Sequence, residues 1–132
     1  MRGVDADVLA CYVTEDDAAR FAAMDAVIER ARADGEKFFV TGLALCRLSD
    51  ILAAHERTAL CDLLDRLLHL ELFEIENRQL VLKALARYRM GPGKLADYLM
   101  AEISKSAGCR DMLTLAPAMA AERGFALPLA GA

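Results

Sequence analysis

The segment KFFVTGLALCRLSDIL, residues 37–52, decides the fold class. Aromatic and β-branched residues predict a strand over 37–41, and an apolar pattern of helical period follows at once over 42–54. Arg47 stands inside that helical pattern, between apolar residues. The direct succession of a strand and a helix is typical of α/β folds, so the segment raises the question of what Arg47 faces.

The same alternation continues on both sides of this segment. Further strands are predicted at 2–6, 72–76, 111–115 and 125–129, and further helices at 7–13, 14–35, 57–70, 78–90 and 94–108. Strands separated by helices pair in parallel through crossover connections. We therefore expect a three-layer α/β/α fold with a central parallel sheet of four to five short strands, built as a single domain over 1–132.

The predicted helix over 14–35 has clear start and stop signals. Thr14 is a capping residue at its beginning, and Gly35 ends it. Its apolar residues recur at helical spacing and predict a buried stripe of Phe21, Met24, Val27 and Ile28.

Composition narrows the classes of function. The 132 residues are 56% hydrophobic and 27% charged, with a formal net charge of −4, which argues against bulk electrostatic coating of nucleic acid but permits a local basic groove. Asp5 interrupts the N-terminal segment before an apolar run forms, and no stretch approaches about 20 apolar residues. We therefore expect a cytoplasmic protein with no membrane partner.

The cysteines form no CxxC pair and predict small buried thiols at Cys11, Cys46, Cys61 and Cys109.

Parallel α/β folds gather functional groups beyond the carboxyl ends of their strands. That rule selects Asp5 at the end of the first strand, the loop before Asp97, and residues 114–116 at the end of the fourth strand. The GPG segment at 91–93 enters a helix but lacks the remainder of a phosphate-binding loop, so it predicts a helix break. A basic series on the 78–90 helix predicts a solvated face, with an RNA contact as the alternative; it comprises Arg78, Lys83, Arg87 and Arg89.

Four blocks of the chain resemble PIN domains of the VapC toxin type, in the family's order and spacing. They are GVDADVLACYVTEDD (3–17), FFVTGLALCRLSDIL (38–52), the segment 72–109 with its KLADYLM motif, and MLTLAPAMAAERGFALPL (112–129). The resemblance implies a ribonuclease that depends on Mg²⁺ or Mn²⁺, in which four acidic side chains hold one or two cations. It also implies RNA as substrate, a small antitoxin protein as partner, and a homodimer.

The resemblance assigns four acidic positions, of which this chain retains two. Asp5 matches the first acid and Asp97 the third, so both are implied as catalytic residues and metal ligands. Arg47 stands where the second acid is expected, and Ala116 where the fourth is expected. The implied site has therefore lost half of its acidic ligands, and each missing carboxylate removes one full negative charge.

Further positions of the motif bear on the same site. Lys94 stands where the family often has an additional acid, and Asp7 where it has asparagine. Thr41 and Thr114 follow strands and are expected either to position a phosphate or a water, or to satisfy backbone groups at the strand ends. Asp50 lies one helical turn after Arg47, so Asp50 or Asp7 is a candidate for a relocated carboxylate.

We expect the Arg47 guanidinium to occupy the place of the metal and to bridge Asp5 and Asp97. Replacing an acid by a base changes the local charge by two units, and at ~4 Å with an effective dielectric of ~20 each unit is worth roughly 4 kcal/mol. Mg²⁺ affinity should then fall by orders of magnitude.

Two interpretations follow from these substitutions. In the first, the chain is a VapC-type ribonuclease with impaired or lost catalysis. In the second, it is a non-catalytic module that binds RNA or a protein and engages an antitoxin or a partner PIN subunit. A third and more distant possibility is an unrelated binding domain with a similar arrangement of strands and helices.

Overall fold

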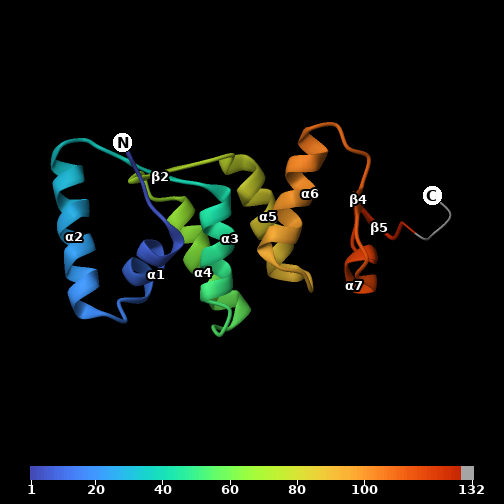
Figure 1. The fold of residues 1–132 in the computed structure, drawn as a ribbon, viewed down its shortest axis with the longest axis horizontal. Coiled ribbons are helices and arrows are strands. Elements are labelled where there is room, and N and C mark those ends of the chain that lie inside the picture. The colour runs from blue at the N-terminus through green and yellow to red at the C-terminus, as the bar shows by residue number, and fades with distance from the viewer. Residues whose placement is uncertain (129–132) are drawn as a thin grey trace. The chain divides into compact units, whose positions relative to one another are not determined.

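The computed structural model describes residues 1–128 and divides the chain into two compact units, with the boundary between Arg78 and Gln79 (Figure 1). Both units are mixed α/β. Within the described residues, no helix is long and apolar enough to cross a membrane.

Unit 1 contains a parallel sheet in the order β1-β2-β3 with helical crossovers. Its elements are β1 (Arg2–Gly3), α1 (Ala6–Thr14), α2 (Ala18–Ala33), β2 (Phe38–Val40), α3 (Gly42–Ile51), α4 (Arg57–Leu68) and β3 (Phe73–Ile75). The helices α1 and α2 connect β1 to β2, and α3 and α4 connect β2 to β3. Parallel pairing through crossovers, as predicted from the alternation of strands and helices, is confirmed.

The core of unit 1 forms around the central strand β2. Phe38 and Val40 are buried, and the Phe38 ring lies 6.3 Å from the ring of Phe73 on β3. The apolar side of α4 is buried at Leu60, Leu64, Leu67 and Leu68. Helix α1 lies between α2 and α3 (Figure 1) and buries Leu9 completely. This packing fixes the beginnings of α1 and α3 at the carboxyl edge of the sheet.

The predicted cap at Thr14 is wrong. Thr14 is the last residue of α1 and its hydroxyl donates to the Ala10 carbonyl, while Glu15 adopts a left-handed φ of 56° that ends α1. Helix α2 begins later, because the Asp17 carboxylate accepts a hydrogen bond from the Arg20 N–H at 3.0 Å. The stop at Gly35 is confirmed, with a φ of 68° directly after the end of α2.

The buried stripe predicted on α2 is formed only in part. Ile28 is fully buried, whereas Phe21, Met24 and Val27 keep partial exposure. The rings of Tyr12 and Phe21 stack at 5.9 Å, which attaches the first turn of α2 to α1. The remaining exposure leaves Met24 and Val27 available to line a pocket.

Unit 2 contains a second, smaller parallel sheet. Its elements are α5 (Arg78–Met90, beginning at the boundary), α6 (Leu95–Ser106), β4 (Met112–Leu113), α7 (Pro117–Ala120) and β5 (Phe125–Ala126). Strands β4 and β5 pair in parallel, and α6 lies with α5 on one side and this pair on the other (Figure 1). The predicted fifth strand at 125–129 ends outside the described residues at Leu129.

The mixed α/β class is confirmed, but the strands pair in two separate sheets instead of the one central sheet that was expected. The strands β1, β4 and β5 have two residues each, so each offers few ladder hydrogen bonds to a neighbour. The single domain over 1–132 stays a prediction.

The predicted burial of all four cysteine thiols is wrong. Cys61 is buried in α4, Cys11 and Cys46 are partly buried, and Cys109 is exposed. Cys109 lies in the turn after α6, directly behind Gly108, where no helical face covers it.

The GPG turn at 91–93 ends α5 as predicted and packs around a buried tyrosine. The Tyr98 hydroxyl accepts a hydrogen bond from the Gly93 N–H at 3.0 Å and donates to Glu122 Oε1 at 2.7 Å. A Cβ atom on Gly91 would overlap the Tyr98 hydroxyl, and one on Gly93 would lie 2.7 Å from Met119 Sδ. Close packing around Tyr98 therefore requires glycine at position 91.

We predict that Tyr98→Phe destabilises the protein by about 1–3 kcal/mol, because it leaves a buried N–H and a carboxylate without their partner. Urea unfolding measures the change in the free energy of unfolding. Tyr12→Phe is the matched control, because within the described residues the Tyr12 hydroxyl makes no hydrogen bond. Equal effects of the two variants would contradict the prediction.

The same hydroxyl predicts a loss of stability at high pH. Burial raises the pKa of Tyr98 above its ordinary value of 10.0, and the hydrogen bond to Glu122 raises that pKa further. Because the folded state holds the neutral phenol, its contribution is present below pH ~10 and is lost as the pH rises toward the folded pKa. Unfolding measured across this range should show the stability difference between wild type and Tyr98→Phe shrinking. A difference that stays constant would contradict the assignment.

Candidate functional site

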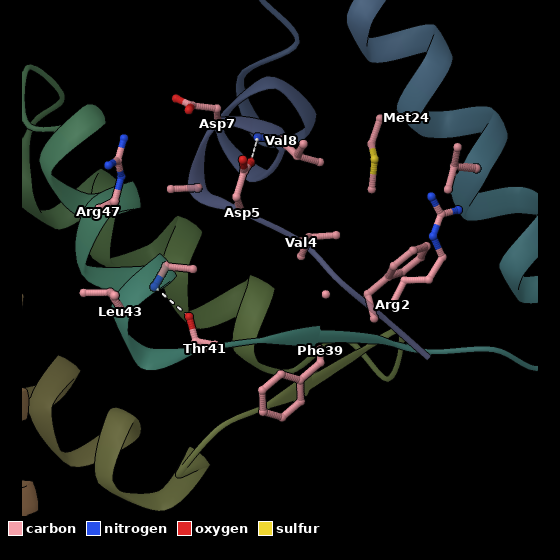
Figure 2. Close-up of a pocket in the computed structure, with 15 residues that line it drawn as sticks. Arg2, Val4, Asp5, Asp7, Val8, Met24, Phe39, Thr41, Leu43 and Arg47 are labelled. Atoms are coloured by element: carbon pink, nitrogen blue, oxygen red, sulfur yellow. Dashed lines mark hydrogen bonds between the residues drawn. The ribbon is translucent and has the colours of Figure 1, made fainter.

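A pocket of about 750 Å³ opens at the carboxyl ends of β1 and β2 in unit 1 (Figure 2). Four of the residues singled out in the sequence line it, namely Asp5, Asp7, Thr41 and Arg47. The other side chains are largely apolar, with one further cation; they include Arg2, Val4, Met24, Val27, Phe39 and Leu43. The pocket thus lies at the edge of the sheet that the rule of strand ends selects.

Asp5 lies two residues after the end of β1 and caps α1. The Val4 N–H donates to the Phe39 carbonyl at 3.1 Å and thereby continues the pairing of β1 with β2. Asp5 then adopts extended backbone, and its Oδ1 accepts a hydrogen bond from the Val8 N–H at 2.9 Å (Figure 2). Its carboxylate therefore caps the N-terminus of α1, where the positive end of the helix dipole favours a negative charge.

Thr41 has the same role at the end of β2. Its hydroxyl accepts a hydrogen bond from the Ala44 N–H at 3.0 Å and caps α3. Glu76, at the end of β3, accepts a hydrogen bond from the Gly42 N–H at 2.9 Å and satisfies a second group of the same helix. Glu76 was missed in the sequence, although an acid at the end of a predicted strand is the signal that selected Asp5.

Arg47 lies on α3 at the side of the pocket, with Asp5 and Asp7 on the neighbouring α1 (Figure 2). Its side chain is exposed, and within the described residues it makes no ion pair. The expected ion pair between Arg47 and Asp5 is therefore not formed, because the Asp5 carboxylate is directed to the first turn of α1. Asp50, one turn further along α3, is exposed and does not line the pocket.

The charges that line this pocket do not fit a divalent cation. A hard dication takes six or more oxygen ligands and favours several carboxylates. Here Asp5 and Asp7 are matched by the guanidinium groups of Arg2 and Arg47, and Asp5 already accepts a backbone hydrogen bond. Within the described residues, no three histidine, cysteine, aspartate or glutamate side chains are grouped to hold a metal ion.

The remaining candidates belong to unit 2, and they too make local hydrogen bonds. Asp97 is the third residue of α6 and its Oδ2 accepts from the N–H of Lys94, whose own side chain is exposed. Thr114 follows β4, and its hydroxyl accepts from the Ala116 N–H at 3.1 Å. Ala116 occupies the capping position of α7 without a side-chain acceptor of its own.

No family model matches the chain, and comparison with curated proteins and with solved structures found no match either. The resemblance to PIN domains therefore depends on the quoted sequence blocks and stays a prediction.

We predict that Asp5→Ala destabilises the protein by about 1 kcal/mol through loss of the α1 cap, while Asp5→Asn retains most of the stability because asparagine is an equally good capping residue. Thermal and urea unfolding of both variants measure this difference. Equal destabilisation by alanine and asparagine would show that the charge, and not the cap, is what Asp5 contributes.

Proposed function

We propose that the chain is a PIN-like protein of the VapC type whose ribonuclease chemistry is impaired or lost, and that it binds RNA in the pocket at the ends of β1 and β2. The proposal includes the family's three-layer arrangement of helices around parallel strands. It also includes the family's context, which is a small antitoxin protein as partner and pairing as a homodimer.

The observation that carries the proposal is the position of Arg47. An exposed guanidinium without a carboxylate partner among the described residues lines the pocket, at the position where the PIN resemblance implies an acid. A guanidinium presents a planar set of donors that matches the oxygen atoms of a phosphate. A pocket that is poorly suited to a dication is thus suited to the anionic backbone of RNA.

The rest of the lining supports binding of a single strand. Arg2 adds a second cation, and Phe39 adds an aromatic residue to the lining of the same pocket. Cations that follow the backbone and an aromatic side chain on which a base stacks are the usual components of single-strand binding. The volume of about 750 Å³ is within the range of pockets that enclose small ligands, so it accommodates one or two nucleotides.

A second candidate function is a Mg²⁺- or Mn²⁺-dependent endoribonuclease with a relocated acid. One observation favours it, because Asp7 lines the same pocket as Asp5. In that case Asp7 supplies the carboxylate that the position of Arg47 lacks. Asp50 is not part of this candidate, since it lies outside the pocket lining.

We predict that the protein binds a short single-stranded RNA without added metal, and that Arg47→Ala weakens this binding about tenfold through loss of a charge-assisted contact. Fluorescence anisotropy with a labelled oligonucleotide measures the affinity. Arg66→Ala is the matched control, because Arg66 is an exposed arginine on α4 that does not line the pocket. Equal losses of RNA affinity in the two variants would show that only the overall charge matters, and would contradict the assignment of the pocket.

The same oligonucleotide separates the two candidate functions. We expect no cleavage when Mn²⁺ is added. Cleavage that requires Mn²⁺ and is abolished in both Asp5→Ala and Asp7→Ala would contradict the proposal and establish the second candidate.

A further inference from the structure

Unit 2 contains a pocket that the proposed function does not use. It has a volume of about 260 Å³ and lies where the end of α6, the start of β4 and the turn between α7 and β5 meet. Its lining residues are Arg87, Ala101, Glu102, Lys105, Cys109, Arg110, Asp111, Met112, Arg123 and Gly124. Basic side chains from separate parts of the chain therefore converge on one small cavity.

The floor of this pocket is rigid because Arg87 is held on several sides. Its guanidinium lies 5.2 Å from the ring centre of Tyr98 and 5.5 Å from that of Phe125, and it donates to the Arg123 carbonyl at 2.5 Å. Glu102 is its carboxylate partner at 3.8 Å, with side-chain exposures of only 20% for Arg87 and 11% for Glu102. The solvated basic face predicted for α5 is therefore wrong at Arg87, which is half-buried.

The rim of the pocket carries an excess of positive charge. Arg110 has a carboxylate partner, since its Nε lies 3.7 Å from Asp111 Oδ2. Lys105 and Arg123 are exposed, and within the described residues they have no carboxylate partner. The four basic and two acidic groups of the lining leave a balance of two positive charges, on a chain whose net charge is −4.

The local secondary structure explains only part of this excess. Lys105 is in the last turn of α6, where a cation compensates the negative end of the helix dipole. Arg123 has no such role, because it lies in the turn between α7 and β5. That turn is held by the hydrogen bond from the Arg87 guanidinium to the Arg123 carbonyl and by the left-handed φ of 85° at Gly124. The backbone thus holds Arg123 beside the same cavity as Lys105.

We propose that this pocket binds a phosphate group. A compact dianion neutralises the two cations that have no carboxylate partner, Lys105 and Arg123. The arginine guanidinium can donate two parallel hydrogen bonds to phosphate oxygens, and the lysine ammonium binds phosphate as a point charge. Glu102 and Asp111 oppose an anion, but each lies within ion-pair distance of an arginine. The volume is below the range of pockets that enclose a drug-sized ligand, so the ligand is one phosphate or a diphosphate.

The test is an NMR titration of the full chain with inorganic pyrophosphate, followed through the backbone amide signals. We expect saturable shifts that are confined to residues 105–112 and 122–126, with a Kd of about 1 mM or tighter. Competition with a short single-stranded RNA identifies the source of the phosphate. Displacement of pyrophosphate from these amides indicates the RNA backbone, and its persistence indicates a free phosphate or a small phosphorylated molecule; either result supports the site.

Variants separate a built site from general electrostatics. Lys105→Gln and Arg123→Gln should each weaken pyrophosphate binding about fivefold or more, whereas Lys83→Gln should leave it unchanged. Lys83 is the matched control, because it is an exposed lysine of the same unit that does not line the pocket. Absence of saturable shifts, shifts centred on residues 2–8 and 39–47, or equal losses in all three variants would overturn the proposal.

Discussion

The requirement that the first N–H groups of a helix find acceptors governs the candidate site of this protein. In a parallel α/β unit each helix begins just beyond the carboxyl end of a strand, so the residue at that position is available both for capping and for binding. In unit 1 the polar side chains at these positions accept hydrogen bonds from the helix N-termini. Asp5 accepts from Val8, Thr41 from Ala44, and Glu76 from Gly42. The same local pattern recurs in unit 2 at Asp97 and Thr114, which satisfy backbone N–H groups of their own turns.

This constraint changes what the pocket offers a ligand. A carboxylate that accepts a backbone hydrogen bond retains its charge but directs one oxygen into the helix, and two guanidinium groups balance the two acids that line the pocket. The result is a neutral pocket with exposed donors, in contrast to the strongly negative cluster that a dication requires. The pocket of unit 2 likewise contains both occupied and exposed charged groups. Arg87 contacts two aromatic rings and donates to a carbonyl, while the neighbouring cations remain exposed.

Local features of the sequence predicted the structure well, and interactions between distant residues did not follow from it. Aromatic residues predicted β2, and Gly35 marked the end of α2. The beginning of α2 was misplaced because Thr14 and Asp17 are both good capping residues and the stronger signal lies later in the chain.

The bonds that were missed join residues far apart in sequence. Glu76 reaches Gly42 across 34 positions, and Tyr98 reaches Glu122 across 24. No spacing pattern encodes such pairs. The division into two sheets was missed for a similar reason, since strand pairing depends on packing between segments as well as on the strand sequences. For the site, strand ends selected Asp5, which lines the pocket of unit 1, but side-chain direction decided that Arg47 does not pair with Asp5.

The most direct test of the central claim is paramagnetic broadening of backbone amide signals by Mn²⁺ at low concentration. If the carboxylates at the strand ends serve as helix caps, the signals of residues 4–8 and 41–47 should broaden no more than those beside other exposed acids, and Arg47→Glu should introduce selective broadening there. Selective broadening of these signals in the wild-type protein would show that a dication is held at this edge, and would contradict the account.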